Sequence, residues 1–78
     1  MKTKLKNVDQ IPRKEFEDAA EYDALLAAQI AKEDVTVTLR SVEVRGGESD
    51  YYCIELQSGR SIDGLSGAHL VNIEAFED

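Results

Sequence analysis

The residues that most often carry chemistry in proteins are sparse in this 78-residue chain. Its one cysteine, Cys53, and its one histidine, His69, are far apart in sequence, whereas a metal site needs several clustered nitrogen or sulfur ligands. Ser66 lies three residues before His69, but no pattern marks an oxyanion hole or an acid that would orient the histidine. We therefore expect no catalytic residue, no metal site and no cofactor, in a protein that is not an enzyme.

Acidic side chains are dense in one segment, where they offer charge for binding a partner. The candidate partner-binding carboxylates are Glu15, Glu17, Asp18, Glu21 and Asp23. On a helix they would spread over two to three turns, and negative charge of this density can imitate nucleic-acid phosphates to a partner that binds DNA or RNA through lysine and arginine. The alternative is a solvated helix face that binds nothing.

Tyr51 is the other candidate for partner binding. On simple strand alternation, Tyr51 and Cys53 share the face opposite to Tyr52 and Ile54. An exposed tyrosine beside acidic residues is a common composition of protein interfaces. The alternative is that Tyr51 packs against a neighbouring strand or the N-terminal segment.

Charge divides the chain into two parts. Residues 1–14 carry five basic side chains against Asp9 alone, a balance of +4, whereas residues 15–78 carry four basic side chains against fifteen acidic ones, a balance of −11. Residues 15–78, with that charge, repel phosphate backbones and attract basic protein surfaces. Direct nucleic-acid binding by residues 15–78 is therefore unfavourable. The alternative is that the acidity only keeps a small protein soluble.

A helix is predicted within residues 12–33, which are rich in helix formers and begin with Pro12, a residue that suits a first helical position. The apolar side chains at helical spacing are those of Phe16, Ala19, Ala20, Leu26, Ala27 and Ile30. Asp23 falls within this stripe, and burying a lone carboxylate is costly. A break near residues 20–22 would reorient the second half and resolve the conflict. With or without the break, we expect Leu26 and Ile30 in the core.

From residue 35 onward, apolar residues alternate with polar ones, which predicts strands. The alternation changes phase near Arg40 and Ser41, where a β-bulge or strong bend would explain it. In a last strand, Val71 and Ile73 are expected to face inward. The strands predicted after the first are at 51–57, 60–63 and 69–76, with turns at 45–50 and 58–59 and a loop at 64–67.

These elements predict an α+β protein, with an N-terminal helix packed on a curved antiparallel meander of 3–4 strands whose curvature suits a barrel. Residues 1–10 are expected as a basic N-terminal arm or an edge strand, and residues 11–78 as a single α+β domain. The chain has no apolar run that could span a bilayer, no apolar segment behind its first lysines, and a single cysteine that has no intramolecular disulfide partner. We expect a cytoplasmic protein.

The stretch from Ile54 to Leu65 resembles the first motif of Sm-like RNA-binding barrels. In that motif two strands flank a turn glycine, here Gly59, and a second glycine, here Gly64, permits sharp bending. The resemblance implies barrel-like curvature. The chain departs from the family because two strands precede Gly59 and the second Sm motif is missing, so no functional residue is carried over.

The favoured function is a non-enzymatic inhibitor or adaptor whose acidic face docks on a basic, nucleic-acid-binding surface of a larger protein or ribonucleoprotein complex. In its small size, single domain and high negative charge, the chain is similar to virus-encoded proteins that block host defence complexes, among them anti-restriction and anti-CRISPR proteins. That similarity is one of class and not of motif. One alternative is a homo-oligomeric or subunit-type module that pairs through a sheet edge or the Tyr51 face. Another is a small Sm-like RNA-binding barrel that uses the basic arm.

Overall fold

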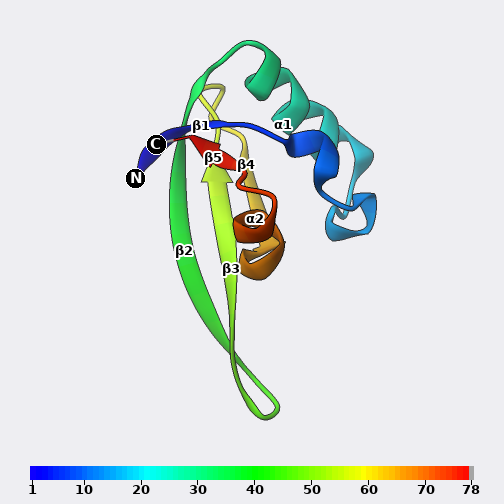
Figure 1. Ribbon diagram of the computed structural model, residues 1–78, viewed down its shortest axis with the longest axis vertical. Coiled ribbons are helices and arrows are strands. Elements are labelled where there is room, and N and C mark those ends of the chain that lie inside the picture. Colours follow the sequence, from blue (N-terminus) through cyan, green and yellow to red (C-terminus); the bar gives the residue numbers. More distant parts are fainter. Residues whose placement is uncertain (78) are drawn as a thin grey trace.

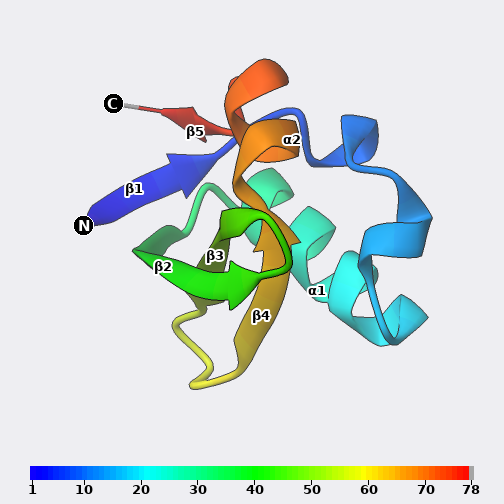
Figure 2. The ribbon, with the colours of Figure 1, turned by 90° about the horizontal axis from the view of Figure 1, so that it is seen from below.

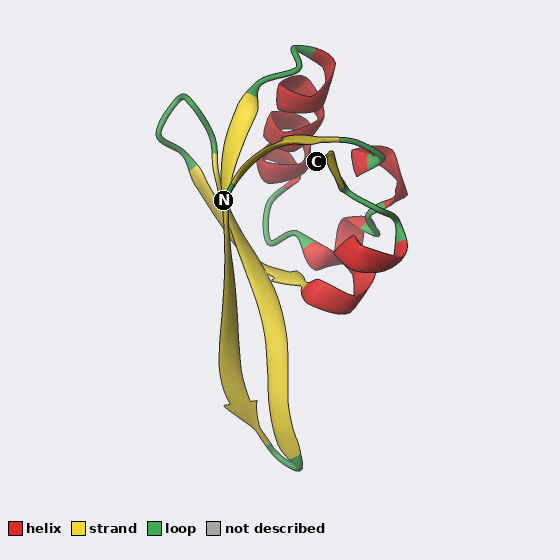
Figure 3. Ribbon diagram, turned by 60° about the vertical axis from the view of Figure 1, so that its left-hand side comes forward, coloured by secondary structure: helices red, strands yellow, loops and turns green. Residues whose placement is uncertain are grey.

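Five antiparallel strands form one sheet, in the spatial order β4-β3-β2-β1-β5 (Figure 1). The computed structural model describes residues 1–77. The strands are β1 (Lys2–Leu5), β2 (Asp34–Val44), β3 (Gly47–Glu55), β4 (Ser61–Ser66) and β5 (Phe76–Glu77). The helices are α1 (Ala19–Ile30) and α2 (Gly67–Asn72), and two 3-10 turns, η1 (Val8–Gln10) and η2 (Arg13–Glu15), precede α1. The helices lie on one side of the sheet (Figure 3).

Helix α1 is bounded by two local signals. At its start, the Asp18 carboxylate accepts a hydrogen bond of 2.9 Å from the backbone N–H of Ala20, which satisfies one of the unpaired donors of the first turn. At its end, Lys32 adopts a left-handed conformation with φ of 56°, and the N–H of Glu33 donates to the carbonyl of Ala28. This is the hydrogen-bond pattern of a Schellman motif, which ends a helix by turning the chain sharply.

The helix is shorter than predicted and presents a different face to the core. Residues 12–18 are not part of it. Asp18 is the N-cap of α1, and the backbone of Phe16, which follows η2, is extended. The buried side chains of α1 are Leu25 and Ala28, whereas Ile30 is 72% exposed and Leu26 is only partly buried. The prediction of Ile30 in the core is therefore wrong. Asp23 is exposed on an unbroken helix, so no break near residues 20–22 is needed.

The helix is also not the first element, because β1 precedes it. Residues 2–5 lie between β2 and β5 in the sheet, so this segment is an inner strand and neither a loose arm nor an edge. Leu5 and, just after the strand, Val8 are buried in the core. The polar side of β1 carries Lys4, which pairs with Asp34 at 2.5 Å. That hydrogen bond, together with the lysine charge, lowers the pKa of the Asp34 carboxyl below its usual 3.8.

Strands β2 and β3 form a long hairpin that projects beyond the helices (Figures 1 and 3). Their pairing is continuous from Thr36 opposite Glu55 to Val44 opposite Gly47, so the predicted bulge at Arg40 and Ser41 is absent. The phase change in the sequence has another cause. Every residue from 38 to 50 is exposed, and a strand that has left the core no longer needs to keep its apolar residues on one face.

The irregularity of the sheet lies in β4 instead. Tyr52 pairs with Leu65 and Ile54 with Ile62, so two residues of β4 stand opposite Cys53 alone. The second of the two, Gly64, has φ of 80°, a left-handed conformation that glycine adopts without strain. This bulge brings both Ile62 and Leu65 into the core although they are three residues apart.

The predicted last strand at 69–76 is wrong, because α2 extends through residue 72 and a turn follows it. A second Schellman motif ends α2: Glu74 has φ of 53°, and the N–H of Ala75 donates to the carbonyl of Leu70. The turn buries Ala75 completely and leaves Val71 62% exposed, so Val71 does not face inward. Only Phe76 and Glu77 are extended, as β5 on the far side of β1.

The sheet is open, with β4 at one edge and β5 at the other, so the barrel-like closure implied by the Sm-like resemblance is not formed. The core lies between the sheet and the helices at one end of the molecule, which measures 39 × 25 × 23 Å. The fold is thus α+β with an antiparallel meander of five strands. Among residues 1–77, no helix has the length and apolar character needed to cross a membrane.

Candidate functional site

An open hollow of about 490 Å³ lies where the hairpin leaves the core, on the side of β4. Figure 2, which views the molecule from the hairpin end, shows β4 beside β3 on the side of α1. The hollow is lined by residues of β2, β3, β4 and the segment before α1: Val42, Ser49, Asp50, Tyr51, Asp63, Gly64, Ser66 and Glu17. Three carboxylates therefore surround one half-buried tyrosine and one valine.

Local structure holds these side chains in place. Tyr51 pairs with Arg40 on one side and with Ser66 on the other, so its backbone is fixed by two neighbouring strands. Asp50 accepts a hydrogen bond of 2.7 Å from the Ser41 hydroxyl. Asp63 lies in the β4 bulge, where its carboxylate accepts a hydrogen bond of 3.0 Å from the N–H of Gly64. The backbone thus sets the spacing of the charges.

The carboxylates of the hollow have no cationic neighbour at ion-pair distance. Within residues 1–77, the one ion pair between a lysine or arginine and a carboxylate joins Lys4 to Asp34, on another part of the sheet. Glu17, Asp50 and Asp63 are therefore available to a cation from outside. Beside the hollow, a guanidinium would also meet the ring of Tyr51, an arrangement that proteins use for cation–π contacts.

The five predicted carboxylates do not form one helical track. Glu15 is in η2, Glu17 and Asp18 lie in the turn that follows, and only Glu21 and Asp23 are in α1. Asp18 serves as the helix cap. Of the five, Glu17 alone lines the hollow with Tyr51. The structure thus joins one member of the acidic segment to the predicted tyrosine and leaves the others outside.

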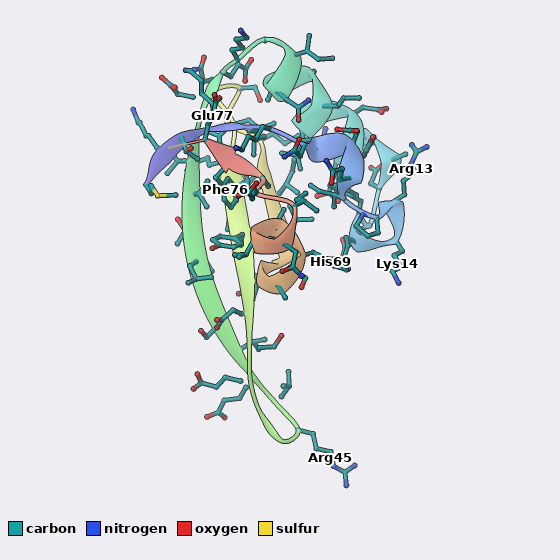
Figure 4. All side chains as sticks on the ribbon, viewed as in Figure 1. Arg13, Lys14, Arg45, His69, Phe76 and Glu77 are labelled. Atoms are coloured by element: carbon teal, nitrogen blue, oxygen red, sulfur yellow. The ribbon has the colours of Figure 1, made fainter. Side chains whose placement is uncertain are left out.

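Basic and aromatic side chains interrupt the acidic segment. The Arg13 guanidinium lies 5.0 Å from the centre of the Tyr22 ring, and Phe16 packs edge-on against the same ring at 5.5 Å. Nδ1 of His69 lies 3.7 Å from a carboxylate oxygen of Glu15. Figure 4 shows Arg13 and Lys14 on the turn beyond His69. A partner that binds this acidic segment in place of phosphates would therefore also meet the positive charges of Arg13 and Lys14 at one end of it.

Sequence reasoning missed Asp50, Asp63 and Val42 as site residues. The hairpin register, which places Ser41 opposite Asp50 and Val42 opposite Ser49, could have identified two of them once the turn was fixed at residues 45 and 46. Asp63 carries no such signal, because its position depends on the β4 bulge.

A second open hollow, of about 560 Å³, lies between the hairpin and α2. Its apolar side chains are Leu39, Tyr52, Ala68 and Val71, and its acidic rim is Glu48 and Asp50. Leu39 is 56% exposed there. Asp50 and its neighbour Ser49 line both hollows, so the base of the hairpin is flanked by negative charge on two sides.

Cys53 follows Tyr51 on the same face of β3, and its thiol is deactivated. Partial burial, with the neighbouring Asp63 carboxylate, raises the pKa of the thiol above its usual 9.0. We expect the rate of iodoacetamide alkylation, followed by mass spectrometry against pH, to reach its half-maximum above pH 9.0. Asp63→Asn should shift that midpoint down, since it removes one of the causes that raise the pKa of the Cys53 thiol. Alkylation at pH 7.5 as fast as in the urea-unfolded chain would contradict this expectation.

No three histidine, cysteine, aspartate or glutamate side chains of residues 1–77 are grouped to hold a metal ion. Comparison of the chain with models of protein families, with curated proteins and with solved structures found no match.

Proposed function

We propose that this protein is a non-enzymatic inhibitor or adaptor that docks an acidic surface on a basic, nucleic-acid-binding surface of a larger protein or ribonucleoprotein complex. The observation that carries the proposal is the hollow at the base of the hairpin, where Glu17, Asp50 and Asp63 meet Tyr51. Its carboxylates would take the place of phosphate oxygens, and its tyrosine would take the place of a base on which arginine stacks.

The charge of the whole chain supports the same proposal. A net charge of −7 on 78 residues steers the protein toward basic surfaces and away from nucleic acid. The mimicry would be local to the hollow, because the five carboxylates at residues 15–23 are divided among three segments. The proposal includes the phage-type class of anti-defence proteins, with a cytoplasmic partner, and it requires no catalytic residue.

Capture of partners from a nuclease-treated lysate of the source cell tests the proposal. Three forms of the immobilised protein are compared at low and at high salt. The first is the unaltered chain. The second neutralises the hollow with Glu17→Gln, Asp50→Asn and Asp63→Asn. The third has the same net charge as the second but changes carboxylates elsewhere, with Asp9→Asn, Glu33→Gln and Glu74→Gln. The matched pair separates the effect of the hollow from that of net charge.

We expect one nucleic-acid-binding complex to be captured at low salt and released at high salt, because screening weakens contacts between exposed charges. Added DNA or RNA should also release it, since the protein occupies the nucleic-acid surface. Neutralising the hollow should lower the captured amount by about tenfold or more, equivalent to about 1.4 kcal/mol. Equal losses from both triple variants, or a captured complex that still binds nucleic acid fully, would refute the proposal.

A further inference from the structure

Two exposed apolar side chains from different elements border the second hollow, which lies between the hairpin and α2. Leu39 of β2 is 56% exposed and Val71 of α2 is 62% exposed, and both line this hollow of about 560 Å³. Tyr52, which pairs opposite Leu39, and Ala68 complete its apolar lining. Single exposed apolar side chains are ordinary on a protein surface, but apolar side chains gathered around a hollow are typical of a binding site.

The backbone fixes the two walls of this hollow. Leu39 lies on the same face of β2 as the buried Val37, so it extends the apolar face of the sheet beyond the core. On the other side, α2 begins directly against β3. A Cβ atom on Gly67 would lie 3.3 Å from the carbonyl oxygen of Asp50, so the glycine permits this close approach. The hollow is thus formed by a strand and a helix that pack against each other.

The acidic side chains beside the hollow face each other without a cation between them. Glu48 and Asp50 line its rim, and Glu43 pairs directly opposite Glu48. Like charges directly opposite on a sheet repel one another. No basic side chain lines the hollow, and within residues 1–77 none of the three carboxylates is in an ion pair with lysine or arginine. Arg45 lies at the tip of the hairpin, away from the hollow (Figure 4).

We propose that the second hollow binds a basic amphipathic helix of the protein partner. Its apolar side chains would pack on Leu39 and Val71, and its lysine or arginine side chains would lie beside Glu43, Glu48 and Asp50. This inference rests on the proposed function, because it names the part of the basic partner that meets the second hollow.

The charge and the shape of the hollow favour this occupant over others. A second copy of the chain would bring a further net charge of −7, and nucleic acid or an anionic membrane would be repelled in the same way. An extended peptide binds mainly through backbone groups at a sheet edge, whereas the hollow offers side chains of a sheet face and of α2. An amphipathic helix binds through an apolar stripe, and basic residues beside that stripe would complement the acidic rim.

Fluorescence anisotropy with two labelled peptides tests the proposal. The first is a model helix with leucines at helical spacing and lysines elsewhere, and the second has the same composition in scrambled order, so that only the first forms an apolar stripe. Each is titrated with the unaltered chain, with Leu39→Ser plus Val71→Ser, and with a matched control, Ile30→Ser plus Val44→Ser. The control replaces two exposed apolar residues that line neither hollow. Circular dichroism confirms that each variant is folded.

We expect the unaltered chain to bind the amphipathic peptide about tenfold more tightly than the scrambled one, a preference that burial of about two methylene groups would supply. Leu39→Ser plus Val71→Ser should abolish the preference, and the control should keep it. At low salt, Glu43→Gln plus Glu48→Gln should weaken binding of the amphipathic peptide more than Glu33→Gln plus Glu74→Gln, which gives the same net charge.

Equal affinities for the two peptides, or a preference that survives Leu39→Ser plus Val71→Ser, would overturn the proposal. A dimer of the unaltered chain in sedimentation velocity that this double variant abolishes would assign the hollow to a second copy, and would overturn it too. The proposed function fails separately. Lysate capture that depends on the first hollow, without any peptide preference, removes the helix inference alone. A peptide preference without such capture removes the proposed function and leaves the helix-binding hollow.

Discussion

Leu25→Ala is expected to destabilise the protein by about 2–5 kcal/mol, which is comparable with the roughly 3–5 kcal/mol that a lone core of this size supplies. Leu25 is fully buried in α1 and belongs to the same core as Val8, Ile54 and Leu70. Its removal deletes apolar contacts and leaves a cavity that a core of this size has few side chains to fill. Urea unfolding followed by circular dichroism measures the loss.

Ile30→Ala is the matched control on the same helix. Ile30 is 72% exposed, so its truncation should change the free energy of unfolding by no more than about 0.5 kcal/mol. The comparison distinguishes the structure from the sequence pattern, because the apolar stripe in the sequence favours Ile30 as a core residue and would predict a large loss of stability for Ile30→Ala. Equal losses for the two substitutions would show that α1 packs in a phase other than the one described.

The positions at which the helices end could not be predicted from the sequence. Both helices stop at a left-handed residue, and in both cases that residue is not glycine: Lys32 after α1 and Glu74 after α2. Glycine or asparagine is the usual signal at this position. Without it, residues 69–76 look like a strand, and the exposed Val71 looks like a core residue. The tertiary packing of Leu70 and Ala75 decides the matter.

The strands were more predictable where they border the core. Val35, Val37, Ile54 and Leu56 alternate with polar residues, and all four are buried. From residue 38 onward the alternation no longer predicts which side chains are buried, because the hairpin there has solvent on both faces. A pattern that depends on burial predicts a bend where the structure has only a strand leaving the core. β1 was missed as an inner strand because its alternating lysines resemble a charged arm.

For the candidate site, the sequence identified the residue types and missed their assembly. Tyr51 and Glu17 were both predicted as binding residues, and they line one hollow although they are distant in the chain. The β4 bulge completes the hollow, because it places Asp63 and Gly64 opposite Cys53. A bulge depends on which residues of two strands are needed in the core, and that choice is made by the whole fold.

Deletion of residues 1–10 is expected to abolish the cooperative thermal transition of the protein. The segment contributes Leu5 and Val8 to the core, and burying two such side chains is worth about as much as the 3–5 kcal/mol that a lone core of this size supplies. It also holds the rest of the chain together through hydrogen bonds. The N–H of Val8 donates to the Gln29 side chain at 2.7 Å, and the Asn7 side chain donates to the carbonyl of Ile73 at 2.7 Å.

The same deletion would therefore mislead as a test of the basic arm in RNA binding, since any loss would follow from unfolding. Lys2→Gln with Lys6→Gln removes positive charge from the segment and leaves Lys4 paired with Asp34. This variant should melt within a few degrees of the unaltered chain, because polar substitutions away from the core change stability by no more than about 0.5 kcal/mol. Circular dichroism melting of the three chains checks both expectations.

A cooperative transition in the deleted chain at the original temperature would mean that β1 contributes little to the sheet. Weaker RNA binding by the folded lysine variant in a mobility-shift assay would instead favour the arm as a nucleic-acid contact.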